Sequence, residues 1–201
     1  WAERIPPSYE RELWRATCLS TLRPGPEAVE AARKLTQMKP EAALSYFIAS
    51  TAYLGAGNAE KAAEMASKAT ERAPRSAMPR LMLANALRLQ GKFPESHAAL
   101  VKATEVEPDA AIARYYLGLS LQGHGVLEEA SRSFEKALEI AQRQGATHFS
   151  LSDAHFRLGS IRLGLGRKDT ALPAFRSAVE AARTEGSWNP QAHLALANLL
   201  F

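Results

Sequence analysis

Glycine, proline and alanine recur at a fixed interval in the middle of this chain, and this repetition limits its possible folds more than any other feature. The interval is 34 residues in each of three series, which are Gly57, Gly91 and Gly125; Pro40, Pro74 and Pro108; and Ala69, Ala103 and Ala137. Internal periods of this size are typical of stacked structural repeats. One such unit cannot bury enough apolar surface alone, so the sequence predicts an array in which neighbouring units cover one another.

The fullest copy of the repeat lies between residues 116 and 137. It begins with the run Tyr116–Leu121, turns at Gly125 and continues with Ala130, Phe134 and Ala137. This order resembles the tetratricopeptide repeat (TPR) family, whose 34-residue unit is a pair of helices. The resemblance implies an all-α fold, a right-handed superhelical solenoid of antiparallel helix pairs with about 11 helices. It also implies a concave face that holds a partner protein.

The chain is predicted to form a single TPR array over residues 1–201. Pro6 and Pro7 predict an extended lead-in over Trp1–Pro7, because proline lacks an amide donor and disfavours helix before it. Ser8 is the expected N-cap of the helix that opens a degenerate first repeat, residues 8–40. Three regular repeats are predicted to follow, at 43–76, 77–110 and 111–144.

The interval then lengthens to 41 residues, from Gly125 to Gly166. Because no proline closes the third pair, its second helix is expected to extend to Gln144, and a 7-residue insertion to precede a fourth repeat at 152–185. Longer repeats of this kind resemble those of kinesin light chain and of LGN-type scaffolds. Residues 190–201 are predicted to be the first helix of a truncated repeat, with Asn189 as its N-cap.

Charge and cysteine content exclude several classes of protein. The 25 Lys and Arg against 21 Asp and Glu leave a net charge of +4, without the basic patch expected of a nucleic-acid-binding protein. Cys18 is the only cysteine, so neither an internal disulfide nor a CxxC metal site can form. No apolar run is long enough to span a membrane. The first residue is Trp1, so the native N-terminus is expected to be absent, and cytoplasmic and periplasmic locations both stay open.

The sequence contains no recognisable catalytic or cofactor motif. Its five histidines lack the i, i+4 pairing of metalloprotease sites. The glycine-rich stretch at 159–166 resembles a phosphate-binding loop only superficially, because Leu165 stands where the lysine is required. We therefore expect no enzymatic activity, no cofactor and no bound metal.

The remaining candidate site is the concave face, which the TPR resemblance assigns to particular turns of the first helix of each pair. Matching positions follow the spacing i, i+3, i+7, which places them on one helical face. The residues assigned to partner binding are Phe47, Thr51, Met78, Leu81, Asn85, Arg88, Ile112, Tyr115, Leu119, Phe156 and Ser160. An apolar row is expected from the four at equivalent places, Phe47, Leu81, Tyr115 and Phe156. The alternative is that this row packs in the core, as apolar helical stripes usually do.

These features predict a protein-interaction scaffold that binds an apolar peptide or helix of a partner protein in the concave groove, with Asn85 and Arg88 fixing its register. The alternative is a non-catalytic substrate-recognition or oligomerisation arm of a larger enzyme, glycosyltransferase-like or sulfotransferase-like, truncated after residue 201. A third interpretation is homo-oligomerisation through the C-terminal helix, whose apolar residues run from Leu194 to Phe201.

Overall fold

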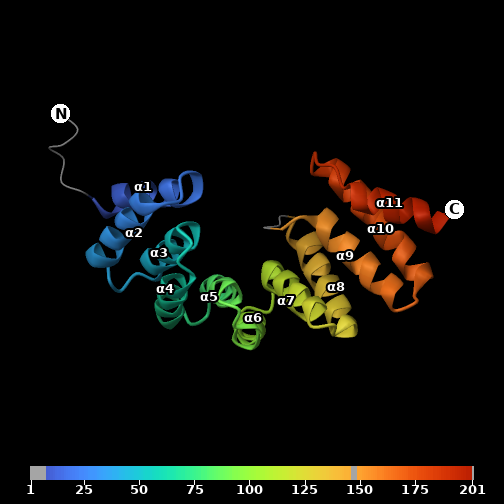
Figure 1. Cartoon of the computed structure of the whole chain (residues 1–201), viewed down its shortest axis with the longest axis horizontal. Helices are drawn as coiled ribbons and strands as arrows, with labels where there is room; N and C mark the ends of the chain where they lie inside the picture. Colours follow the sequence, from blue (N-terminus) through green and yellow to red (C-terminus); the bar gives the residue numbers. More distant parts are fainter. Residues whose placement is uncertain (1–7, 146–148, 201) are drawn as a thin grey trace. The chain divides into compact units, whose positions relative to one another are not determined.

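The computed structural model describes residues 8–145 and 149–200, and all regular structure in these ranges is α-helical (Figure 1). The helices are α1 (Tyr9–Leu22), α2 (Pro26–Met38), α3 (Ala43–Gly55), α4 (Ala59–Arg72), α5 (Ala77–Leu89), α6 (Phe93–Val106), α7 (Ala111–Gly123), α8 (Leu127–Gln144), α9 (Leu151–Gly164), α10 (Lys168–Thr184) and α11 (Pro190–Leu200). The predicted all-α class with about 11 helices is confirmed over these ranges. The predicted lead-in at Trp1–Pro7 and the predicted helix end at Phe201 lie outside the described residues.

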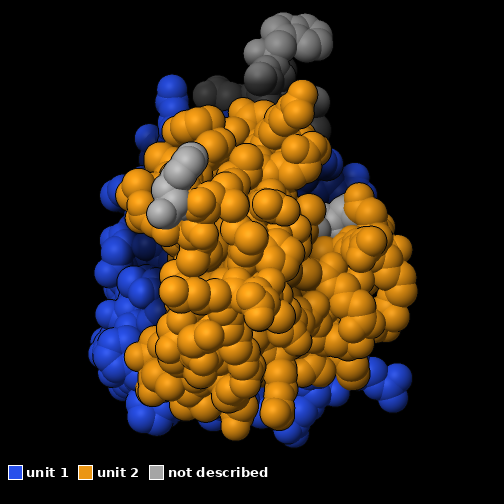
Figure 2. Space-filling model, turned by 90° about the vertical axis from the view of Figure 1, so that its right-hand side faces the viewer, with its two compact units in different colours: residues 1–107 blue, residues 108–201 orange. Residues whose placement is uncertain are grey.

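The chain divides into two compact units, Trp1–Glu107 and Pro108–Phe201 (Figure 2). In the first unit, α1 packs with α2, α3 with α4, and α5 with α6. In the second unit, α7 packs with α8 and α9 with α10, while α11 packs against α10. Consecutive helices therefore form the pairs that the repeat predicts. The exact repeat limits, such as 43–76 and 152–185, stay predictions.

Local sequence signals explain where these helices begin. The Ser8 hydroxyl oxygen accepts a hydrogen bond from the Arg11 backbone N–H at 3.2 Å, so the predicted N-cap of α1 is confirmed. Between α3 and α4, Gly57 has a φ of 76°, a left-handed conformation that glycine adopts without steric cost. Asn58 follows, and its side-chain oxygen accepts from the Lys61 N–H at 3.0 Å to start α4.

In the two helix pairs of the second unit, close approach depends on a glycine that faces a phenylalanine. Gly118 of α7 faces Phe134 of α8, and Gly159 of α9 faces Phe175 of α10. Both rings are almost fully buried, with 0% and 1% of their surface exposed. A side chain at either glycine would meet the ring, so these glycines set the separation of the paired helices.

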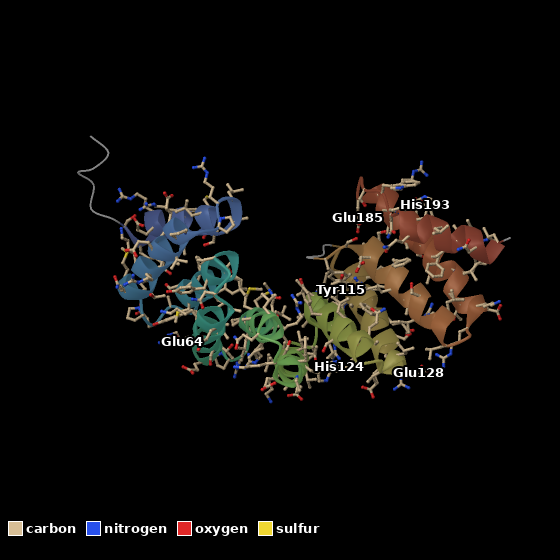
Figure 3. All side chains as sticks on the ribbon, in the orientation of Figure 1. Glu64, Tyr115, His124, Glu128, Glu185 and His193 are labelled. Atoms are coloured by element: carbon tan, nitrogen blue, oxygen red, sulfur yellow. The ribbon has the colours of Figure 1, made fainter. Side chains whose placement is uncertain are left out.

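The end of a second helix closes back onto the start of the first helix of its own pair. The Ala77 backbone N–H donates to the Glu107 carboxylate at 2.8 Å. In the second unit, the Leu151 N–H and the Ser150 hydroxyl donate to the carboxylate of Glu185 at 2.6 and 2.9 Å. Figure 3 labels Glu185. Because the first N–H groups of a helix lack intrahelical partners, these carboxylates satisfy them and join the two ends of the pair.

Helix α8 is longer than its counterparts, with 18 residues against 14 in α4 and in α6. Its extra turn, residues 141–144, contributes Ala141 to the core, while Gln142, Arg143 and Gln144 are exposed. Ile140 and Ala141 form a buried cluster with Ala111, and Phe149 and Leu151 pack against this cluster. The predicted extension of this helix to Gln144 is therefore confirmed, and apolar burial stabilises it.

Candidate functional site

The residues predicted to bind a partner are divided between the two units, so each set is described separately. In the first unit, α3 carries Phe47 and Thr51, and the Thr51 hydroxyl lies 4.0 Å from the sulfur of Met82 on α5. Phe47 is half-buried and packs against the core cluster of the first three helices. Met78 remains 37% exposed at the start of α5. The first helices α3 and α5 therefore lie side by side, with apolar and sulfur-containing side chains between them.

Leu81 differs from the other members of the predicted apolar row. Only 4% of its surface is exposed, so it belongs to the core, as the alternative interpretation of the row expects. Four residues further along α5, Asn85 is half-buried, and its side-chain oxygen accepts a hydrogen bond from Arg88 at 3.1 Å. The exposed Arg88 thus holds the Asn85 amide in one orientation.

The second unit joins α7 and α9 through a compact polar network. The Tyr115 hydroxyl donates to the Asp153 carboxylate at 2.5 Å, and the Nε of Arg157 donates to the same carboxylate oxygen at 2.6 Å. A guanidinium N–H of Arg157 reaches the side-chain oxygen of Gln122 at 3.4 Å. We call these four residues the α7–α9 network. It fixes the position of Tyr115, which Figure 3 shows on α7.

Aromatic rings hold Tyr115 from the other sides. Its ring stacks on Phe149 with the centroids 4.6 Å apart, and it meets Phe134 edge-on at 5.8 Å. Burial, together with the hydrogen bond to Asp153, raises the pKa of the Tyr115 hydroxyl well above its usual range. Burial alone would lower the pKa of Arg157, but the hydrogen bond and charge of Asp153 raise it. The guanidinium is therefore charged, and the phenol stays neutral at physiological pH.

Half-buried apolar side chains lie on the same two helices as this network. Ile112 and Leu119 flank Tyr115 on α7, and Phe156 lies on α9, where its ring is 5.8 Å from the buried Phe175. Ser160 donates to the Phe156 carbonyl one turn earlier, at 2.9 Å. None of the predicted residues of the second unit is fully buried. We call this surface the α7–α9 face.

Sequence reasoning missed the central role of Arg157 in this site. The available signal was the i, i+4 spacing of Asp153 and Arg157, which favours an ion pair on one helical face. The hydrogen bond between Tyr115 and Asp153 spans 38 residues and joins two repeats. Such a contact depends on how the repeats stack, and the spacing within one helix does not indicate it.

The described residues contain no group of three or more His, Cys, Asp or Glu side chains that could hold a metal ion. Among these residues, no helix combines the length and the apolar character needed to cross a membrane.

The paired helices define an α-helical repeat protein. Residues 109–184 match the family model of the tetratricopeptide repeat, so this part of the chain consists of TPRs. The predicted resemblance to the TPR family is therefore confirmed. The finer resemblance to kinesin light chain and LGN-type scaffolds stays a prediction. No curated protein matches the sequence significantly.

Solved TPR structures share the fold of the chain. TTC0263, a thermophilic TPR protein of Thermus thermophilus, aligns with a TM-score of 0.68 at 20% identity over 96% of this chain and 99% of its own. YrrB, described as a TPR protein with an unusual peptide-binding site, aligns with a TM-score of 0.66 at 20% identity. The alignment covers 94% of this chain and 91% of YrrB. A chain of the Cut9–Hcn1 hetero-tetramer of the APC/C aligns with a TM-score of 0.76 at 16% identity. The alignment covers 98% of this chain and 37% of that chain. At these identities the likeness shows the fold.

Proposed function

We propose that this protein is a non-catalytic interaction scaffold and that its first helices bind an apolar peptide or helix of another protein. The TPR fold is consistent with such a scaffold. The observation that carries the finer proposal is the α7–α9 face, where a fixed polar network and half-buried apolar side chains lie on the same two helices. Binding sites commonly combine apolar contact area with a few well-placed polar groups.

The α7–α9 face would bind a partner in two ways. Apolar side chains of the partner would pack on Ile112, Leu119 and Phe156, which supplies most of the affinity. The guanidinium of Arg157 has five N–H donors, of which the contacts to Asp153 and Gln122 use two. A further donor would bind a main-chain carbonyl of the partner. Because Asp153 already orients the guanidinium, little side-chain entropy would be lost on binding.

The first unit would use the same mode of binding on its own surface. Phe47, Thr51 and Met78 would contact apolar side chains of the partner, while Asn85 and Arg88 would fix its register. Leu81 is too buried to touch a partner and would support the surface from beneath. TPR binding of this kind is expected near micromolar affinity, or about −8 kcal/mol.

A selection from a displayed library of random peptides would test the proposal. Peptides that bind the wild-type protein should lose about tenfold in affinity for an Ile112→Ser, Leu119→Ser double variant that circular dichroism shows to be folded. The control is Val126→Ser, which removes a 40% exposed apolar side chain outside the α7–α9 face and should leave affinity unchanged.

The salt dependence of binding provides a separate criterion. Apolar burial is insensitive to ionic strength, whereas contacts between exposed charges are screened at about 0.5 M salt. Affinity for the selected peptides should therefore change little between low salt and about 0.5 M. Loss of binding at high salt would contradict an apolar mode of recognition.

Self-association through α11 is a second candidate, and the exposure of this helix favours it. Leu194 and Leu200 are 63% and 51% exposed, and α11 contains no charged side chain. Exposed apolar side chains of this kind suit contact with a second copy. Light scattering on a Leu194→Glu, Leu200→Glu variant would test it. A mass that is the same for the variant and the wild type would reject this candidate.

A further inference from the structure

Helix α1 has a second face that points away from the core. Its members follow the spacing i, i+3, i+4, i+7, i+11, which places Arg11, Trp14, Arg15, Cys18 and Leu22 on one side of the helix. Trp14 and Leu22 are 72% and 76% exposed, and Cys18 is exposed. We call this surface the α1 outer face. It combines large apolar side chains with two arginines.

The repeat shows what kind of element fits such a face. The residues 34 positions after Trp14, Arg15 and Cys18 are Ile48, Ala49 and Ala52 of α3. All three are buried, in the cluster that they form with residues of α1 and α2. The corresponding face of α3 therefore packs against helices. The α1 outer face has the same helical geometry but presents its side chains to solvent.

The chemistry of the α1 outer face differs from that of α3. Arg11 and Arg15 stand where α3 has the fully buried Ser45 and the almost fully buried Ala49. Two cations at these places are incompatible with the dry, small-residue contact that α3 makes. An occupant of the α1 outer face must therefore supply negative charge as well as apolar area.

A hollow beside this face adds to the positive charge. Its volume is about 510 Å³, and it is lined by Arg11, Glu12, Arg15, Lys34, Gln37 and Met38. Glu12 is only 5% exposed, and its Oε2 lies 3.6 Å from a guanidinium nitrogen of Arg15. The lining therefore includes three cations, Arg11, Arg15 and Lys34, and one carboxylate. The hollow can therefore receive acidic side chains of an occupant.

We propose that the α1 outer face docks an acidic amphipathic helix of another protein. Apolar side chains of that helix pack on Trp14 and Leu22, and its carboxylates pair with Arg15 and Lys34. The helical form follows from the packing of the equivalent face of α3, and the acidic character follows from charge complementarity. The uncharged α11 of a second copy lacks the carboxylates that this face requires.

The reactivity of Cys18 reports directly on occupancy of this face, because it is the only cysteine of the chain and lies within the face. The probe is a synthetic helical peptide with leucines along one side and glutamates beside them. The reagent is iodoacetamide, which is uncharged and is not steered by the arginines. At saturation the acidic peptide should slow alkylation of Cys18 about fivefold or more, since the reagent needs an accessible thiol. A matched peptide with lysine in place of every glutamate should give no protection.

Two variants separate the apolar and the charge contributions. Trp14→Ala removes an exposed ring, and Lys34→Glu reverses an exposed charge at the hollow. Each substitution should weaken the binding affinity for the acidic peptide by about tenfold. The control is Lys92→Glu, an identical charge change at an exposed position before α6. The Ile112→Ser, Leu119→Ser variant should bind the acidic peptide normally, which keeps this proposal distinct from the function of the α7–α9 face.

Three results would overturn the proposal. Equal protection by a single-stranded DNA oligonucleotide would show a general polyanion surface. Protection that grows with protein concentration in the absence of peptide would show contact between copies. Unchanged alkylation with the acidic peptide would show that the face does not dock such a helix.

Discussion

Gly159→Ala is the most specific test of how the paired helices pack. A Cβ at this position would lie 2.9 Å from two ring carbons of Phe175, whereas ordinary contact begins at 3.4 Å. The ring would have to recede by about half an ångström, and it is only 1% exposed, so little space exists to receive it.

The expected free-energy change is a balance of two effects. Overpacking of a filled core costs about 1–3 kcal/mol. Replacing glycine by alanine inside a helix gains about 0.5–1 kcal/mol. We therefore expect Gly159→Ala to destabilise the second unit by about 1 kcal/mol, or to lower its Tm by about 4–8 °C.

Urea unfolding followed by circular dichroism would measure this change. The matched control is Gly123→Ala at the end of α7, where an added Cβ meets nothing within 4 Å, so this variant should be as stable as the wild type or more so. Combining Gly159→Ala with Phe175→Leu should cost less than the sum of the two single changes, because the smaller side chain relieves the clash. If Gly159→Ala stabilised the protein as much as Gly123→Ala, the close-approach argument would be refuted.

Three further predictions concern the second unit. Glu185→Ala removes the acceptor of the Leu151 N–H and should cost about 1 kcal/mol, with faster hydrogen exchange at the start of α9. Burial and a neighbouring arginine lower the pKa of His155 below its ordinary 6.5, so folding favours the neutral ring. Stability should fall as the pH drops below 6.5, and His155→Asn should flatten that loss in urea titrations at several pH values. Spectroscopic titration should find one tyrosine that ionises well above the ordinary pKa of 10.0, and Tyr115→Phe should remove it.

The sequence predicted much of the fold because the repeat carries its own signals. Turn glycines such as Gly57, the cap at Ser8 and the spacing of small residues each act within one helix pair. These are local effects, which short stretches of sequence specify. The longer α8 was predictable for the same reason, since no proline ends it. The packing of Phe149 against α8 was not predictable, because that contact joins residues on either side of a loop.

The arrangement of the candidate residues on a helix follows from the sequence, whereas their burial and contacts do not. Helical spacing groups Ile112, Tyr115 and Leu119 on one face of α7, and their role in binding stays a prediction. The same spacing cannot separate an exposed position from a buried one, and Leu81 proves to be core although it stands at the repeat place of Tyr115. Burial depends on the neighbouring repeats. For the same reason, the network around Arg157 emerges only when two repeats are stacked.

Methyl NMR is the most direct test of the central claim that the α7–α9 face binds an apolar segment of a partner. Isoleucine and leucine methyl groups would be labelled, and a peptide from the display selection would be titrated into the protein. The account predicts that the methyl resonances of Ile112 and Leu119 shift on binding. Those of the 53% exposed Leu89, which lies in the other unit and outside the predicted site, should stay in place. Shifts confined to residues outside the α7–α9 face would contradict the account.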